Sequence, residues 1–91
     1  MNNKQRKILS AEKARLENAH DIIESIRENI EEMYGQETDK YNNLPEGLQV
    51  SEMGATMEEI ADMLYDISND LDDISSLLSE ATSNIEEVIS R

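Results

Sequence analysis

The second half of the chain carries large apolar residues at intervals of seven, in two rows three residues apart. The first row consists of Met57, Leu64, Leu71, Leu78 and Ile85. The second row consists of Met53, Ile60, Ile67, Ile74, Ala81 and Val88. Paired rows at heptad spacing are typical of an α-helix that packs along one stripe against other helices. The pattern therefore predicts a coiled-coil-like helix over about residues 52–90.

The first half of the chain repeats this pattern less regularly. One row consists of Leu9, Leu16, Ile23 and Ile30, and its partner row consists of Ala19, Ile26 and Met33. Glu12 interrupts the partner row, while Ile8 and Ile22 widen the stripe, as expected for a helix that faces more than one neighbour. We therefore predict a helix over about residues 4–42.

Turn-forming residues separate the two halves. Residues 42–47 read Asn-Asn-Leu-Pro-Glu-Gly, and Pro45 disfavours the helical conformation of the residue before it. The sequence predicts a loop over about residues 43–51, with Ser51 or Thr56 as the N-cap of the second helix. We expect the apolar residues of this loop to cover the end of the helix pair. They are Leu44, Leu48 and Val50.

Two helices of nearly equal length joined by a short loop form an antiparallel hairpin, so we expect an all-α fold with a single domain over residues 1–91. A hairpin alone leaves part of each apolar stripe in water, and two hairpins are therefore expected to pair as a four-helix bundle. The residues expected in the core of this oligomer are Leu16, Ile23, Ile30, Ile60, Leu64, Ile67, Leu71, Ile74, Leu78 and Ile85. Small residues at heptad spacing beside this seam would let one partner helix approach closely. They are Ala61, Ser68, Ser75 and Thr82.

Charge is abundant and unevenly distributed. The 91 residues include 21 acidic and 8 basic side chains, for a formal net charge of −13. Residues 1–20 hold five of the basic side chains and only two acidic ones, and no Lys or Arg occurs between Lys40 and Arg91. A strongly acidic body repels nucleic acid and anionic lipid, so we expect a basic protein partner and no direct binding to nucleic acid or membrane.

Other classes of protein are excluded by what the composition lacks. Cysteine is absent, which excludes disulfides, thiol chemistry and cysteine-ligated metals. No apolar run is long enough to span a membrane, and no leader pattern is visible. We expect a cytoplasmic protein.

The segment Tyr-Asn-Asn-Leu-Pro-Glu-Gly-Leu-Gln-Val-Ser-Glu-Met-Gly at residues 41–54 resembles a known stretch. It is similar to the NLPE-x-LQ-x-SE-x-G stretch of small uncharacterised helical proteins from bacteriophages and Gram-positive bacterial genomes. The resemblance covers 14 residues. It implies an accessory protein of phage or mobile-element origin that works inside a bacterial host cell, and it brings no catalytic or binding residues with it.

Two acidic pairs are candidates for a metal site. The pair Glu59 and Asp62 resembles the second metal motif, E-x-x-D, of MazG-like all-α nucleotide pyrophosphatases, and Glu28 with Glu31 could supply the earlier E-x-x-E. Acids one helical turn apart can jointly hold Mg²⁺ against a triphosphate. In the heptad register, however, these four residues lie away from the apolar seam, and no basic residue follows nearby to bind phosphate. We therefore expect no catalytic site, no metal and no cofactor.

The single histidine offers two weaker resemblances. His20 with Asp21 is similar to the phospho-accepting pair of sensor-kinase dimerisation bundles, but the proline that follows in those motifs is missing. Glu17 with His20 matches the E-x-x-H of di-iron bundles, but the second helix offers no carboxylate in its apolar rows. His20 is therefore expected to be an isolated residue on the flank of its helix.

One run of acids is a candidate interaction face. Asp62, Asp66, Asp70 and Asp73 follow one another at spacings of four, four and three residues, which places them along one ridge of a helix. Such a ridge can simply keep the protein soluble, or it can occupy the basic groove of a nucleic-acid-binding protein. Small acidic phage proteins that block restriction or CRISPR enzymes resemble this second description. We expect a non-enzymatic, self-associating, protein-binding factor, with an acidic nucleic-acid mimic and a MazG-like hydrolase as the alternatives.

Overall fold

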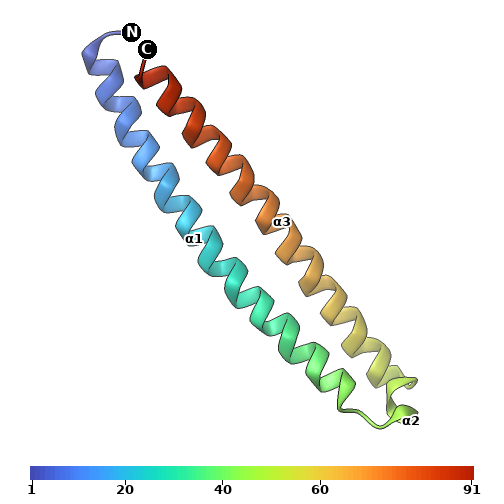
Figure 1. The fold of residues 1–91 in the computed structure, drawn as a ribbon. Coiled ribbons are helices and arrows are strands. Elements are labelled where there is room, and N and C mark those ends of the chain that lie inside the picture. The colour runs from blue at the N-terminus through green and yellow to red at the C-terminus, as the bar shows by residue number, and fades with distance from the viewer.

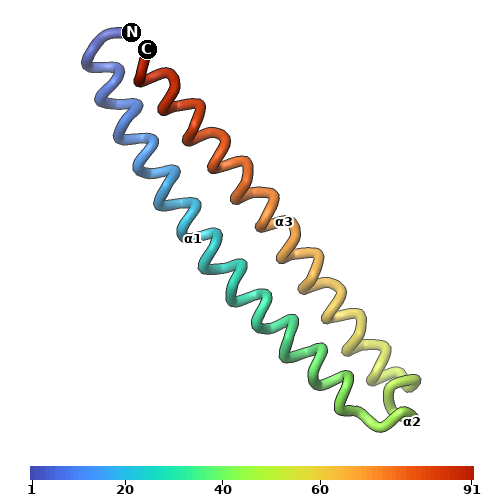
Figure 2. Tube along the Cα trace, viewed as in Figure 1, coloured from blue at the N-terminus to red at the C-terminus, as the bar shows by residue number.

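The computed structural model describes all residues from 1 to 91 and contains only helices. Helix α1 (Asn3–Asn42) and helix α3 (Glu52–Ile89) run antiparallel along their whole length, and the short helix α2 (Glu46–Gln49) lies in the connection between them (Figure 1). The two termini lie together at one end of a rod that measures 68 × 14 × 14 Å (Figure 2). The predicted all-helical fold with a long helix pair is confirmed.

The helix ends follow from local capping. At the start of α1, the Asn2 side chain accepts a hydrogen bond from the Gln5 backbone N–H at 2.7 Å, and the Gln5 side chain accepts one from the Asn2 N–H at 3.2 Å. This capping box extends the helix one residue beyond the predicted start. Of the two N-cap residues predicted for the second helix, Ser51 caps α3 and Thr56 lies within the helix.

The connection is tighter than the predicted loop because its side chains satisfy the free helix ends. The Gln49 side chain donates hydrogen bonds to the carbonyl oxygens of Tyr41 and Leu44, both at 3.1 Å, and so binds the C-terminal end of α1. The backbone N–H groups of Leu48 and Gln49 both donate to the carbonyl of Pro45, which closes the single turn of α2. This turn was not predicted.

The prediction that the loop's apolar residues cover the end of the helix pair is wrong for two of the three. Leu44 is half-buried, but Leu48 is 42% exposed and Val50 is 88% exposed. The physical reason is the hydrogen bonding by Gln49, which already occupies the end of α1 with a polar side chain. The apolar side chains of the connection therefore point into solvent.

The contact between α1 and α3 uses one predicted row from each helix. The row Leu9, Leu16, Ile23 and Ile30 and the row Met57, Leu64, Leu71, Leu78 and Ile85 are all partly buried where the helices meet. We call these the seam rows. Seven of these residues are among those expected in the core of an oligomer, and in one chain they form the contact between the two helices; the oligomer core itself stays a prediction. They are Leu16, Ile23, Ile30, Leu64, Leu71, Leu78 and Ile85.

Beside its seam row, α3 uses a row of small residues in this contact and not its second apolar row. The small residues Ala61, Ser68 and Ser75 are only 4–7% exposed, and Gly54 is buried with them. The row of Ile60, Ile67 and Ile74 is instead 41–42% exposed. The difference arises because α1 presents large side chains opposite the small residues, which leaves room only for small partners. These α1 residues are Arg6, Lys13, His20, Arg27, Tyr34 and Tyr41, which we call the polar row.

Candidate functional site

The exposed apolar side chains of the protein gather on two neighbouring rows of each helix. Fifteen large hydrophobic residues are exposed, and ten of them occupy positions three residues after, or one residue before, a seam residue. Met53 continues the first of these rows by one heptad toward the start of α3. On α1 these are Ile8, Ile22, Ile26 and Met33, and on α3 they are Met53, Ile60, Met63, Ile67, Ile74, Leu77 and Val88. We call these eleven residues the open face.

Both halves of the open face lie on the same side of the rod. Two antiparallel helices that meet through equivalent seam rows are related by a twofold axis perpendicular to both, so equivalent heptad positions point the same way. Positions three residues after the seam therefore form one side of the pair, and positions four residues after it form the other. The protein therefore presents an apolar side, which is the open face, and a polar side. We call the polar side the closed edge.

The closed edge is formed by the polar row, the small residues and the acids beside them. Lys13 reaches across to Glu86 at 3.2 Å, the Ser68 hydroxyl donates to Glu31 at 3.4 Å, and the rings of Tyr34 and Tyr65 lie 5.6 Å apart. The two residue numbers of each pair add to the same total, so all three contacts share one register. The register of α1 against α3 is therefore constant over about half the length of the rod.

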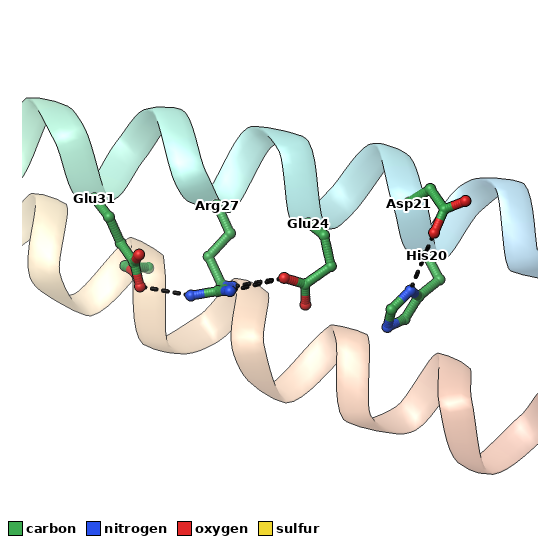
Figure 3. Close-up of polar contacts among 6 residues, drawn as sticks. His20, Asp21, Glu24, Arg27 and Glu31 are labelled. Atoms are coloured by element: carbon green, nitrogen blue, oxygen red, sulfur yellow. Dashed lines mark hydrogen bonds and ion pairs between the residues drawn. The ribbon is translucent and has the colours of Figure 1, made fainter.

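Arg27 is the centre of the polar contacts on this edge. Its guanidinium lies 2.7 Å from a Glu24 oxygen and 2.5 Å from a Glu31 oxygen, and the three side chains form a line between α1 and α3 (Figure 3). The hydrogen bond from Arg27 lowers the pKa of Glu24, and the same bond raises the pKa of Arg27. Hydrogen bonds to Glu17 and then Glu86 raise the pKa of Lys13. Glu24, Arg27 and Lys13 therefore stay charged at neutral pH. The ion pairs of Arg27 order side chains along α1, whereas Lys13 also joins α1 to α3 through Glu86.

The candidate metal ligands do not form a cluster. Glu28, Glu31, Glu59 and Asp62 are all exposed, and Glu31 is engaged by Arg27 and Ser68. No group of three His, Asp or Glu side chains is arranged so that it could hold a metal ion. The spacing along the sequence correctly places the two acids of each pair one helical turn apart. The fold does not bring the pair on α1 and the pair on α3 together.

His20 lies in the polar row at the closed edge. Its Nδ1 atom is 3.6 Å from an oxygen of Asp21 (Figure 3). His20 borders a small hollow whose other residues are Glu17 and Asp21 of α1 and Ser79, Thr82 and Ser83 of α3. Glu17 is held by Lys13 at 3.0 Å, so it does not join His20 in a ligand pair.

Three acids of the ridge, Asp62, Asp66 and Asp73, lie on the outer side of α3. Asp70 directly precedes the seam residue Leu71 and therefore lies between Met63 and Leu77 at the border of the open face. Asp62, Asp66, Asp70 and Asp73 are all exposed, and none of them forms an ion pair. By contrast, Glu24 and Glu31 beside the polar row are both paired with Arg27. The ridge is therefore unneutralised negative charge that faces solvent.

Two residues of the open face were missed in the sequence. Met63 and Leu77 are among the most exposed apolar side chains, and each directly precedes a seam residue. They correspond to Ile8 and Ile22 of the first half, which the sequence did indicate. Searching both halves for the same third row would have found them.

Comparisons with known proteins do not add an identity. No protein-family model matches the chain, and no curated protein or solved structure is significantly similar to it. None of its helices combines the length and the apolar character that crossing a membrane requires.

Proposed function

We propose that this protein is a non-enzymatic helical factor that associates with itself and works by binding another, basic protein. The observation that carries the proposal is the open face, where eleven large apolar side chains are exposed along one side of the rod. Half-exposed side chains of this size contribute on the order of 80 Å² each, or roughly 800 Å² in total, which is the area that each partner buries in a stable interface. Single chains seldom expose continuous apolar patches of this size.

Self-association is tested by light scattering at micromolar concentration. The expected mass is twice the 10.4 kDa of one chain, or a higher multiple. Ile67→Lys places a charge in the middle of the open face and is expected to leave a monomer, because a charged side chain is costly to bury without a partner. Val50→Lys is the matched control, since Val50 is exposed outside the open face, and it should keep the oligomer. A wild-type mass of about 10 kDa would refute self-association.

The hydrolase alternative is tested directly. We expect no pyrophosphate release when the protein is incubated with Mg²⁺ and a panel of nucleoside triphosphates. Pyrophosphate release that disappears in Glu59→Gln would overturn the non-enzymatic proposal, because Glu59 is the first residue of the MazG-like E-x-x-D.

The acidic ridge supports a second candidate function, in which the protein mimics nucleic acid and inhibits a host defence nuclease. Its four carboxylates are exposed, lack ion-pair partners and follow one side of a straight helix, so they offer a line of charge to a basic groove. The resemblance of residues 41–54 to phage proteins agrees with this role inside a bacterial host cell.

Mimicry is tested by DNA cleavage. Restriction and CRISPR nucleases from Gram-positive hosts are assayed with and without an excess of the protein. Inhibition should disappear in the variant that carries Asn at positions 62, 66, 70 and 73. A matched variant with Gln at the exposed acids Glu28, Glu32, Glu58 and Glu80 should retain it. Equal loss in both variants would show that only net charge matters.

A further inference from the structure

We propose that two copies pair open face to open face with their α2 ends pointing in opposite directions. This inference rests on the proposed self-association and adds the arrangement of the two copies. Only two twofold arrangements bring the faces together. With the α2 ends side by side, α1 lies against α3 of the partner; with the α2 ends opposed, α1 lies against α1 and α3 against α3.

The α1 row of the open face favours the opposed arrangement. Extended to both ends, the row reads Glu12, Ala19, Ile26, Met33 and Lys40 at intervals of seven. A twofold axis at Ile26 pairs Glu12 with Lys40 of the partner subunit and Ala19 with Met33 of the partner subunit. An acid then meets a base, and a small side chain meets a large one. Glu12 and Lys40 pair within α1 with Arg15 and Glu37, and in this arrangement each gains a second partner of opposite charge across the dimer.

The α3 row accepts the same axis. The cross-helix contacts at the closed edge place Ile26 level with Asp73, directly beside Ile74. An axis at Ile74 pairs Ile67 with Ala81 of the partner subunit and Ile60 with Val88 of the partner subunit. Every pair on this row is apolar, and the one small residue again meets a large one. A single twofold axis therefore serves both helices without shifting either.

The alternative arrangement pairs the same residues poorly. With the α2 ends side by side, residues at the same level of α1 and α3 would meet. Glu12 would face Val88 of the partner subunit, Lys40 would face Ile60 of the partner subunit, and Ala19 would face Ala81 of the partner subunit. Charged groups would lose water against apolar side chains, and two alanines would leave a void.

A distance between labels separates the two arrangements. The chain has no cysteine, and a side chain at Gly47 in α2 would meet nothing within 4 Å, so Gly47→Cys carries a spin label without disturbing the fold. In the opposed dimer the two labels should be about 60 Å apart, from the helical rise of 1.5 Å per residue. In the alternative dimer they would lie within roughly 30 Å, the width of a four-helix bundle. Dipolar spectroscopy that finds the short distance in a confirmed dimer would overturn this inference and leave the proposed function intact.

A charge swap tests the Glu12–Lys40 pairing itself. Glu12→Lys and Lys40→Glu should each weaken the dimer roughly tenfold, because each replaces two attractive pairs with two repulsive ones. The double variant should recover to within about threefold of wild type, since the charges are exchanged and still opposite. Glu32→Lys, on the outer side of α1, is the matched control and should change the dissociation constant little. A double variant weaker than either single variant would refute the pairing, and a monomeric wild type would refute the proposed function as well.

Discussion

The open face and the closed edge arise from the same seven-residue repeat, yet they differ in every physical respect. The closed edge pairs small residues of α3 with long polar side chains of α1, and it holds the helices in one register through contacts that Lys13, Glu31 and Tyr34 make with α3. The open face consists of medium and large aliphatic side chains that are 41–64% exposed. The comparison teaches that hydrophobicity alone does not determine which side of a helix meets its nearest neighbour. Here the polar side fixes the hairpin and the apolar side remains available.

Among substitutions that test the contrast between the closed edge and the open face, Gly54→Ala is expected to have the largest effect on stability. A Cβ at this position would overlap the backbone carbonyl oxygens of Leu48 and Gln49, so Gly54→Ala must displace the connection from the closed edge. We expect a loss of about 3 kcal/mol in the free energy of unfolding, measured by urea titration of the helical circular dichroism. Gly35→Ala is the matched control. Its added methyl meets nothing within 4 Å and should stabilise α1 by about 0.5–1 kcal/mol. Equal effects at the two glycines would contradict the close approach at Gly54.

A large side chain on the small-residue row should have the next largest effect. Ser75 is 4% exposed between the helices, so Ser75→Leu should push α1 away and cost about 2 kcal/mol. Ser76→Leu makes the same chemical change at the next residue, which is exposed, and should cost less than about 0.5 kcal/mol. Thermal unfolding of both variants at matched concentration checks the difference. If Ser76→Leu were the more harmful of the two, the assignment of the closed edge would be incorrect.

Removing the Ser75 hydroxyl should have a smaller effect of the opposite sign. The Oγ atom is buried and forms no hydrogen bond of good geometry, although it lies near enough to the Glu24 carboxylate to help lower the pKa of Glu24. Ser75→Ala is therefore expected to stabilise the protein by about 0.5 kcal/mol, because it removes a poorly satisfied buried hydroxyl and improves helix propensity. A rise in the midpoint of thermal unfolding relative to wild type is the measurement. Ser68→Ala is the comparison variant, and its gain should be smaller because the Ser68 hydroxyl donates to Glu31.

The smallest expected effect is a pH dependence at Glu24. The hydrogen bond from Arg27 lowers the pKa of Glu24 below its ordinary value, so ionised Glu24 stabilises the folded state. This contribution is present above about pH 4.5 and is lost as the pH falls through the lowered pKa. Glu24→Gln should therefore be less stable than wild type at pH 7, and the difference in urea unfolding should shrink steadily as the pH is lowered from pH 4.5. A difference that does not depend on pH would mean that Glu24 contributes through packing instead.

Much of the fold could be predicted because the strongest local signals agree with it. Heptad rows and turn residues placed the ends of α1 and α3 within one residue of those observed, since apolar spacing and Pro45 act on the chain locally. The choice between the two rows beside the α3 seam could not be predicted in the same way. It depends on the size of the side chains that α1 places opposite, and Arg27 and Tyr34 become relevant only once the register between the helices is known.

The same distinction, between features of one helix and features that need two, applies to the candidate sites. The ridge from Asp62 to Asp73 could be placed along one exposed line of its helix because a ridge is a property of one helix. That Asp70 borders the open face depends on which row of α3 meets α1. A metal site formed by Glu28 and Glu59 requires two helices to bring their acids to one point, and spacing along the chain contains no information on that. Val50 shows the same limit, since its exposure is set by the hydrogen bonds of Gln49 and not by its own hydrophobicity.

The shared register of the cross-helix contacts limits how the length of this protein can change. Each residue of α1 is matched to one residue of α3, from Lys13 with Glu86 to Tyr34 with Tyr65. An insertion in one helix alone would move every long polar side chain off its small partner. Only equal insertions or deletions of seven residues in both helices at the same level preserve the match. The rod can therefore evolve in length by steps of about 10 Å, the rise of two helical turns.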